Sequence, residues 1–199
     1  MQIILASGSP RRKELLEQAG YEFIIEVSDA DENISVDFPG DLVEELSFRK
    51  ADAVAKNHGG KNDNFIIIGA DTVVVLDGKV LGKPEGEKGA VVMLRELSGR
   101  THQVYTGVSL LVIKNGIMSA KKQFHVCTDV TMRELGEEEI RDYVNTGEPL
   151  DKAGAYGIQG KAAVFISGIC GDYYNVVGLP ICQTALELAH LDENNCGTH

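Results

Sequence analysis

A segment rich in hydroxyl groups and cations lies near the start of the chain, in the order Ser7-Gly8-Ser9-Pro10-Arg11-Arg12-Lys13. It follows a short apolar run, and Pro10 suits the first turn of a helix. Backbone N–H groups at a helix start attract anions, and arginine matches phosphate oxygens in two bonds at once. Cations in the first turn of a helix are unfavourable next to the positive end of its dipole, and a bound anion would remove that conflict. The segment therefore predicts a phosphate-binding site, with a capped helix carrying solvated charges as the alternative.

A single acid interrupts the most apolar stretch of the chain, residues 65–76. Asp71 stands there between Ala70 and Thr72, although aspartate is unfavourable in strands and is rarely buried without a partner. A carboxylate held in a strand suits a metal ligand or a general base. A structural acid bonded to a neighbouring backbone group or cation is the alternative, and we favour the functional interpretation.

Further charged and polar residues could complete such a site. The loop Asp29-Ala30-Asp31-Glu32 offers oxygen ligands for Mg²⁺ or Mn²⁺, although acidic loops are more often simply solvated. Three isolated lysines stand near turns or in a helix: Lys50, Lys83 and Lys152. Gln159 lies between Ile158 and Gly160, where its amide could donate to and accept from a base edge; an amide facing water is the alternative.

Several other classes of chemistry find no support. The five histidines show no paired metal spacing, and neither a G-x-S-x-G nucleophile motif nor a P-loop occurs. The four cysteines form no CxxC pair, which favours reduced thiols. A net charge of −11 argues against binding to a nucleic-acid polymer, while a small anionic substrate remains compatible with it.

The hydrophobic pattern alternates between apolar runs and amphipathic segments, which predicts an α/β fold with a mixed sheet and flanking helices. We expect strands over residues 2–6, 21–27, 65–76, 79–81, 104–113, 116–131 and 163–166. We expect helices over residues 11–19, 41–58, 87–97, 137–146 and 180–190. Hairpin turns are expected at Asp77-Gly78 and around Asn115-Gly116.

The location expected from the sequence is the cytoplasm. No apolar run approaches the ~20 residues needed to span a bilayer, and the first residues lack the pattern of a secretory signal. We therefore expect no association with a membrane. The residues alone indicate an α/β enzyme that acts on a phosphorylated small molecule.

At five segments the sequence closely resembles the Maf family of nucleotide pyrophosphatases. They are residues 5–12, 68–74, 81–84, 151–160 and 171–180, and they occur in order along nearly the whole chain. The resemblance implies one domain over residues 1–199, folded like inosine triphosphate pyrophosphatases as two lobes around a central cleft that holds the nucleotide.

The resemblance also implies a role for each matching residue. Asp71 corresponds to the catalytic general base, and Glu32 joins it as a ligand of a divalent metal, Mg or Mn. The positions that correspond to phosphate-binding residues are Ser7, Arg11, Arg12, Lys50 and Lys83. The positions that correspond to specificity residues are Arg12, Thr72 and Gln159. These three agree with the subgroup that acts on dTTP and UTP, and differ from the one that acts on 7-methyl-GTP.

The implied activity is hydrolysis of pyrimidine nucleoside triphosphates to the monophosphate and pyrophosphate. Modified pyrimidines could be the physiological target, which would give a house-cleaning role. A homodimer is expected from the resemblance alone. Two alternatives stay open: a non-catalytic regulator that binds nucleotide and a cell-division partner, and a phosphomonoesterase that releases phosphate.

Overall fold

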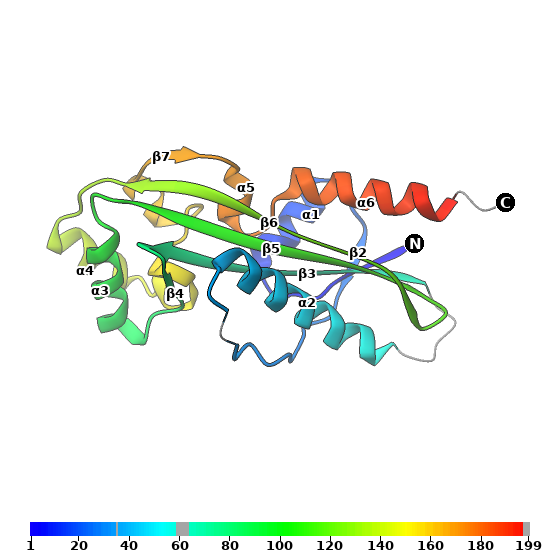
Figure 1. Ribbon diagram of the computed structural model, residues 1–199. Helices are drawn as coiled ribbons and strands as arrows, with labels where there is room; N and C mark the ends of the chain where they lie inside the picture. Colours follow the sequence, from blue (N-terminus) through cyan, green and yellow to red (C-terminus); the bar gives the residue numbers. More distant parts are fainter. Residues whose placement is uncertain (35, 59–63, 197–199) are drawn as a thin grey trace. The chain divides into compact units, whose positions relative to one another are not determined.

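The computed structural model describes residues 1–34, 36–58 and 64–196, with side chains up to Leu191 (Figure 1). Its strands are β1 (Gln2–Leu5), β2 (Phe23–Ile25), β3 (Phe65–Leu76), β4 (Lys79–Leu81), β5 (Thr101–Lys114), β6 (Ile117–Met132) and β7 (Ile166–Cys170). Its α-helices are α1 (Pro10–Gln18), α2 (Pro39–Asn57), α3 (Gly86–Leu97), α4 (Glu137–Asn145), α5 (Tyr173–Val177) and α6 (Ile181–Cys196). Short 3₁₀ helices are η1 (Glu148–Asp151), η2 (Ala153–Ala155) and η3 (Lys161–Phe165).

The strands form one seven-stranded sheet of mixed direction. Its order is β2-β1-β3-β5-β6-β7, with β4 paired to β3 off this path. β1 runs parallel to both β2 and β3, whereas β4 is antiparallel to β3 and β7 is antiparallel to β6. The predicted α/β class with a mixed sheet and flanking helices is confirmed.

The chain forms two compact units. Unit 1 comprises Met1–Asp71, Thr106–Val126 and Gly178–His199, and unit 2 comprises Thr72–Tyr105 and Cys127–Val177. Three of the four boundaries fall inside β3, β5 and β6, so that each of these strands contributes residues to both units, and the fourth follows α5. Strand interiors carry no Gly/Pro-rich linker, which is why the sequence shows no boundary there. The single domain with a central cleft stays a prediction.

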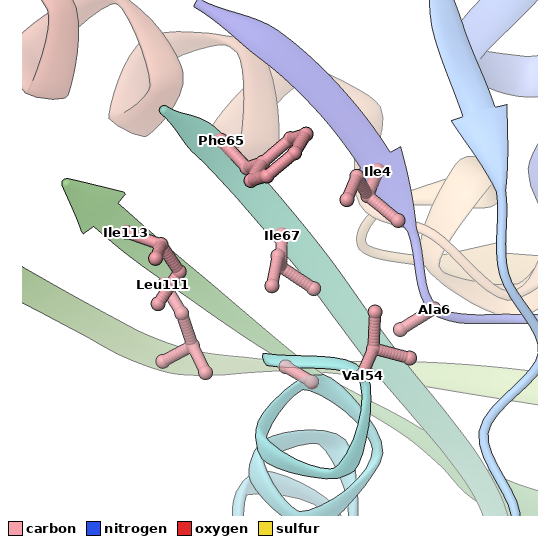
Figure 2. Close-up of a cluster of buried hydrophobic side chains, with 8 residues drawn as sticks. Ile4, Ala6, Val54, Phe65, Ile67, Leu111 and Ile113 are labelled. Atoms are coloured by element: carbon pink, nitrogen blue, oxygen red, sulfur yellow. The ribbon is translucent and has the colours of Figure 1, made fainter. Parts of the chain in front are cut away.

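The core of unit 1 lies where α2 covers the sheet. A cluster of eight buried residues comes from β1 and the residue that follows it, α2, β3 and β5, and Figure 2 shows their side chains meeting between the helix and the strands. They are Ile4, Ala6, Ala51, Val54, Phe65, Ile67, Leu111 and Ile113. Ile66 and Ile68 alternate with these residues on β3 and are also buried. The start of β3 is therefore covered on both faces, as its unbroken apolar run predicts.

Two glycines let α2 approach the sheet closely. A Cβ on Gly69 of β3 would lie 2.1 Å from the carbonyl oxygen of Ser47, and a Cβ on Gly107 of β5 would lie 2.3 Å from that of Val43. Either atom would collide with helix backbone, which cannot move aside cheaply. The missing side chains thus fix α2 on β3 and β5, and α2 carries Lys50.

Unit 2 contains the hairpin of β3 and β4, together with α3, α4 and the 3₁₀ turns. Asp77 and Gly78 have φ of 50° and 77°, the left-handed pair of a tight hairpin turn, as the sequence predicts. Tyr143 of α4 packs edge-on against Phe165, with ring centroids 5.3 Å apart. The turn at Asn115 and Gly116, in unit 1, likewise has positive φ at both residues.

One predicted strand is wrong. Residues 163–166 belong mainly to η3, and the strand β7 begins only at Ile166. The buried residues of η3, Ala162 and Phe165, are spaced by three, whereas Val164 is 70% exposed. A spacing of three fits a 3₁₀ turn and not the alternation of a strand. The short helix α5 is a further element that the sequence pattern does not reveal.

Candidate active site

Lys50 of α2 brings two carboxylates together in unit 1. Its Nζ lies 2.5 Å from Asp71 Oδ1 and 2.8 Å from Glu32 Oε1. The side chains of Lys50 and Asp71 are 15% and 13% exposed, whereas that of Glu32 is 62% exposed. The acid in the apolar strand thus has a cationic partner, a contact that is compatible with both interpretations of its position. Of the two oxygens of Asp71, only Oδ1 has a hydrogen-bond partner among the described residues.

Arg12 forms hydrogen bonds that hold the predicted phosphate-binding segment, residues 7–13, in place. Its Nε donates to the carbonyl oxygen of Gly178 at 2.8 Å, and its Nη1 donates to Ser7 Oγ at 2.9 Å. The backbone N–H of Ser9 also donates to Ser7 Oγ, at 3.3 Å. The buried side chain of Arg12 therefore joins Ser7, which precedes α1, to Gly178, which precedes α6. Gly178 contributes only a backbone carbonyl, which no side-chain pattern could have revealed.

The two groups of residues share one electrostatic environment. Burial lowers the pKa of Arg12; Asp71 opposes that shift, Arg11 adds to it, and Glu32 opposes it. Asp71, Arg11 and Glu32 therefore all lie within electrostatic range of the Arg12 guanidinium. The first turn of α1 has no acidic residue, so its positive end is not neutralised from within the helix. The structure thus places the Arg12 guanidinium against Ser7 and within electrostatic range of both carboxylates.

The two carboxylates are suited to a divalent metal completed by a substrate. Glu32 and Asp71 both contact the same ammonium nitrogen, so one cation can contact both. Mg²⁺ commonly takes one or two protein carboxylates and fills its remaining positions with phosphate oxygens and water. Among the described side chains, which run to residue 191 with gaps at 35 and 59–63, no group of three or more His, Cys, Asp or Glu could hold a metal ion. The two carboxylates fit Mg²⁺ or Mn²⁺ whose remaining positions are filled by phosphate oxygens and water.

Three of the predicted site residues belong to unit 2. Thr72 follows Asp71 directly in β3 and is half-buried, while Lys83 and Gln159 are exposed. The loop containing Gln159 is linked to the neighbour of Lys83, because the N–H of Gly154 donates to the carbonyl oxygen of Gly82 at 3.0 Å. Unit 2 therefore holds the two predicted ligand-binding segments in contact with each other.

Lys152 has a structural partner within its own segment. Its Nζ donates to the carbonyl oxygen of Glu148 and to Asp151 Oδ1, both at 2.8 Å. Sequence reasoning singled out Lys152 and overlooked Glu148, whose carboxylate contacts the loop that presents Gln159. Glu148 stands outside the family-like segment 151–160 and carries no signal beyond the Pro149 that follows it.

The chain belongs to the Maf family, because the family model described as Maf-like protein matches residues 2–191. Curated relatives named dTTP/UTP pyrophosphatase cover nearly the whole chain. The protein of Bacillus cereus (strain B4264) is 50% identical over 192 residues, 96% of both chains, and that of Bacillus mycoides (strain KBAB4) is 50% identical over 194 residues, 97% of both. That of Bacillus thuringiensis subsp. konkukian (strain 97-27) is 52% identical over 188 residues, 94% of both.

A solved structure supports the fold. A HAM1 protein from Coxiella burnetii matches with a TM-score of 0.53 and 18% identity, over 96% of this chain and 99% of that one. The predicted likeness to that fold is confirmed. Among the described residues, no helix is both long enough and apolar enough to cross a bilayer.

Proposed function

We propose that this protein hydrolyses dTTP and UTP to the nucleoside monophosphate and pyrophosphate. The observation that carries the proposal is the cluster of Ser7, Arg12, Glu32, Lys50 and Asp71 in unit 1, where a phosphate-binding segment and a carboxylate pair share one electrostatic environment. Family membership and the names of the curated relatives support the same activity and the pyrimidine preference.

The proposed reaction is attack by water on the α-phosphorus. The bond from water oxygen to phosphorus forms, the bond from that phosphorus to the bridging oxygen breaks, and pyrophosphate leaves. Asp71 takes the proton from water: Lys50 holds Oδ1, and Oδ2 can accept it. Lys50 thus orients the base as well as contributing positive charge near the phosphates.

The remaining predicted residues keep the roles that the resemblance implies. Ser7, Arg11, Arg12 and Lys83 bind phosphate oxygens. Arg12 also orients the Ser7 hydroxyl, because its Nη1 donates a hydrogen bond to Ser7 Oγ. Glu32 and Asp71 would hold Mg²⁺ or Mn²⁺, which when bound neutralises phosphate charge. Thr72 and Gln159, with Arg12, discriminate among bases.

Product analysis with a panel of nucleoside triphosphates tests the proposal. With Mg²⁺ or Mn²⁺ present, the wild type should release pyrophosphate and monophosphate from dTTP and UTP in preference to purine triphosphates. Asp71→Asn should lose at least about a thousandfold in turnover and still bind nucleotide, because it loses the base and keeps the phosphate-binding residues. Release of inorganic phosphate would favour a phosphomonoesterase. Binding without turnover by the wild type would favour the regulatory alternative.

A further inference from the structure

A hydrogen-bonded pair in unit 2 holds the backbone on both sides of Gln159. Tyr143 Oη donates to Glu148 Oε1 at 3.0 Å, and the N–H of Gly157 donates to Tyr143 Oη at 3.3 Å. The N–H of Lys161 donates to Glu148 Oε2 at 3.0 Å. Each anchored N–H thus lies two residues from Gln159, one before it and one after it.

The turn between these anchors packs directly on the carboxylate. The N–H of Gly160 donates to the carbonyl oxygen of Gly157 at 2.9 Å and closes the turn around Gln159. A Cβ on Gly160 would lie 2.0 Å from Glu148 Oε1. Because φ of Gly160 is −95°, its backbone conformation does not require glycine; a side chain here would instead displace the Glu148 carboxylate. Ile158 is buried beside Gln159, whose side chain is exposed.

Tyr143 and Glu148, which we call the clamp, hold the turn through hydrogen bonds that depend on their chemical groups. A carboxylate accepts hydrogen bonds on both oxygens, and here one oxygen faces a phenol and the other faces a backbone N–H. Burial, together with the hydrogen bond to Glu148, raises the pKa of Tyr143, so the phenol remains a donor. Glu148 itself is held through its own carbonyl oxygen by Lys152 Nζ.

We propose that Glu148 and Tyr143 are positioning residues for base selection, which hold the turn 157–161 so that the Gln159 amide meets the pyrimidine in a fixed orientation. The inference rests on the proposed function only in that Gln159 contacts the base. It assigns no contact with substrate to Glu148 or Tyr143. Their effect should therefore appear in discrimination among bases and in nucleotide affinity, and not in the handling of the phosphates.

Glu148→Gln tests the clamp at nearly constant volume. A glutamine removes the charge: its oxygen can still accept from the Lys161 N–H and its amide can donate to Tyr143 Oη, so both hydrogen bonds become neutral ones. Equilibrium affinities are measured in the Asp71→Asn background, so that the comparison needs no turnover. Glu148→Gln should weaken UTP binding about tenfold, the size expected when hydrogen bonds to a charged group become neutral ones. Binding of inorganic tripolyphosphate, which lacks a base, should change by less than about twofold.

Tyr143→Phe provides a second route, since it removes the link to Gly157 and leaves Glu148 in place. It should weaken UTP binding in the same direction without affecting tripolyphosphate. Glu138→Gln, the same chemical change at an exposed position of α4, is the matched control and should leave both affinities unchanged. In enzymes with Asp71 intact, both clamp variants should raise KM for UTP more than they lower kcat, and should narrow the preference for UTP over GTP.

A double-mutant cycle decides whether the clamp acts through Gln159. If it does, Glu148→Gln should cost nothing further in UTP affinity once Gln159→Ala is present. Full additivity of the two losses would overturn the inference, as would an equal loss of tripolyphosphate binding. Unchanged UTP affinity in both folded clamp variants would do the same. Failure of the wild type to release pyrophosphate would instead count against the proposed function, and the binding comparison would still decide the clamp.

Discussion

Lys50 is the residue that links the two carboxylates of the candidate site. Its ammonium group contacts Asp71 and Glu32 at once, and its side chain is only 15% exposed. A largely buried charge is tolerated because it is paired, so removing one partner leaves an uncompensated charge. Lys50 should therefore matter to folding as well as to turnover.

Replacing Lys50 by methionine, which has a similar length and no charge, should lower the free energy of unfolding by about 2 kcal/mol, because Asp71 would lose its ammonium partner. Adding Asp71→Asn should recover about 1 kcal/mol or more, since the neutral amide needs no counter-ion. Urea unfolding of the two single variants and the double variant measures this coupling. If the double variant lost as much free energy of unfolding as the two single variants together, the ion pair would contribute nothing to stability.

At the scale of elements, the placement of α2 on the sheet decides where Lys50 lies. Gly69 is two residues before Asp71 in β3, and its missing side chain admits the backbone of α2 at Ser47. The same close approach recurs at Gly107 of β5. Gly69, in the family-like segment 68–74, therefore lets α2 pack closely enough for Lys50 to reach Asp71.

Gly69→Ala should force α2 away from β3, because its Cβ would meet the Ser47 carbonyl at 2.1 Å. We expect a loss of about 3 kcal/mol in stability and roughly a hundredfold in kcat/KM, since small displacements of catalytic groups are costly. Gly168→Ala is the control: it lies in β7, and nothing approaches the position of its Cβ within 4 Å. Thermal unfolding and steady-state kinetics report both effects. A Gly69→Ala variant as active and stable as Gly168→Ala would contradict this role.

Elements with a strong local signal were predictable from the sequence. The bounds of β3 are as expected, because its apolar run is rich in β-branched isoleucine and valine, which favour a strand. The two glycine-containing hairpin turns follow from local conformational preference. The start of β7 was not predictable, because Ile169 is 38% exposed and the strand lacks a buried face.

Site residues divide in the same way. The predicted phosphate-binding segment and Asp71 stand out because their residue types conflict with their local surroundings. The contact of Lys50 with Asp71 depends on how α2 packs at Gly69, and the bond from Arg12 to Gly178 joins residues far apart in sequence. Spacing along the chain carries no information about either contact.

At the scale of the molecule, burial of His102 couples folding to pH. His102 of unit 2 is fully buried and its Nε2 shares a hydrogen bond with Tyr156 Oη at 2.8 Å. Burial lowers the pKa of His102 from 6.5 to about 4, a shift that Asp129 opposes. The unfolded chain therefore takes up this proton before the folded one does, so the stability is present above pH 6.5 and is lost as the pH falls toward 4.

Between pH 7 and pH 5, protonation of the unfolded chain at His102 should lower the free energy of unfolding by about 2 kcal/mol. His102→Gln should be less stable at pH 7 and should show a decrease toward pH 5 that is smaller by this amount. Urea titrations of both proteins at the two pH values give the difference, in which the contributions of the acidic residues cancel. Parallel decreases in the two proteins would show that His102 is not the group responsible.

Hydrolysis of UTP in ¹⁸O-labelled water tests the proposed reaction most directly, with the products analysed by mass spectrometry. Attack on the α-phosphorus predicts UMP that carries one ¹⁸O and pyrophosphate that carries none, with both products lost in Asp71→Asn. Label in the pyrophosphate would place the attack on the β-phosphorus. UDP with labelled phosphate would contradict the proposed pyrophosphatase activity altogether.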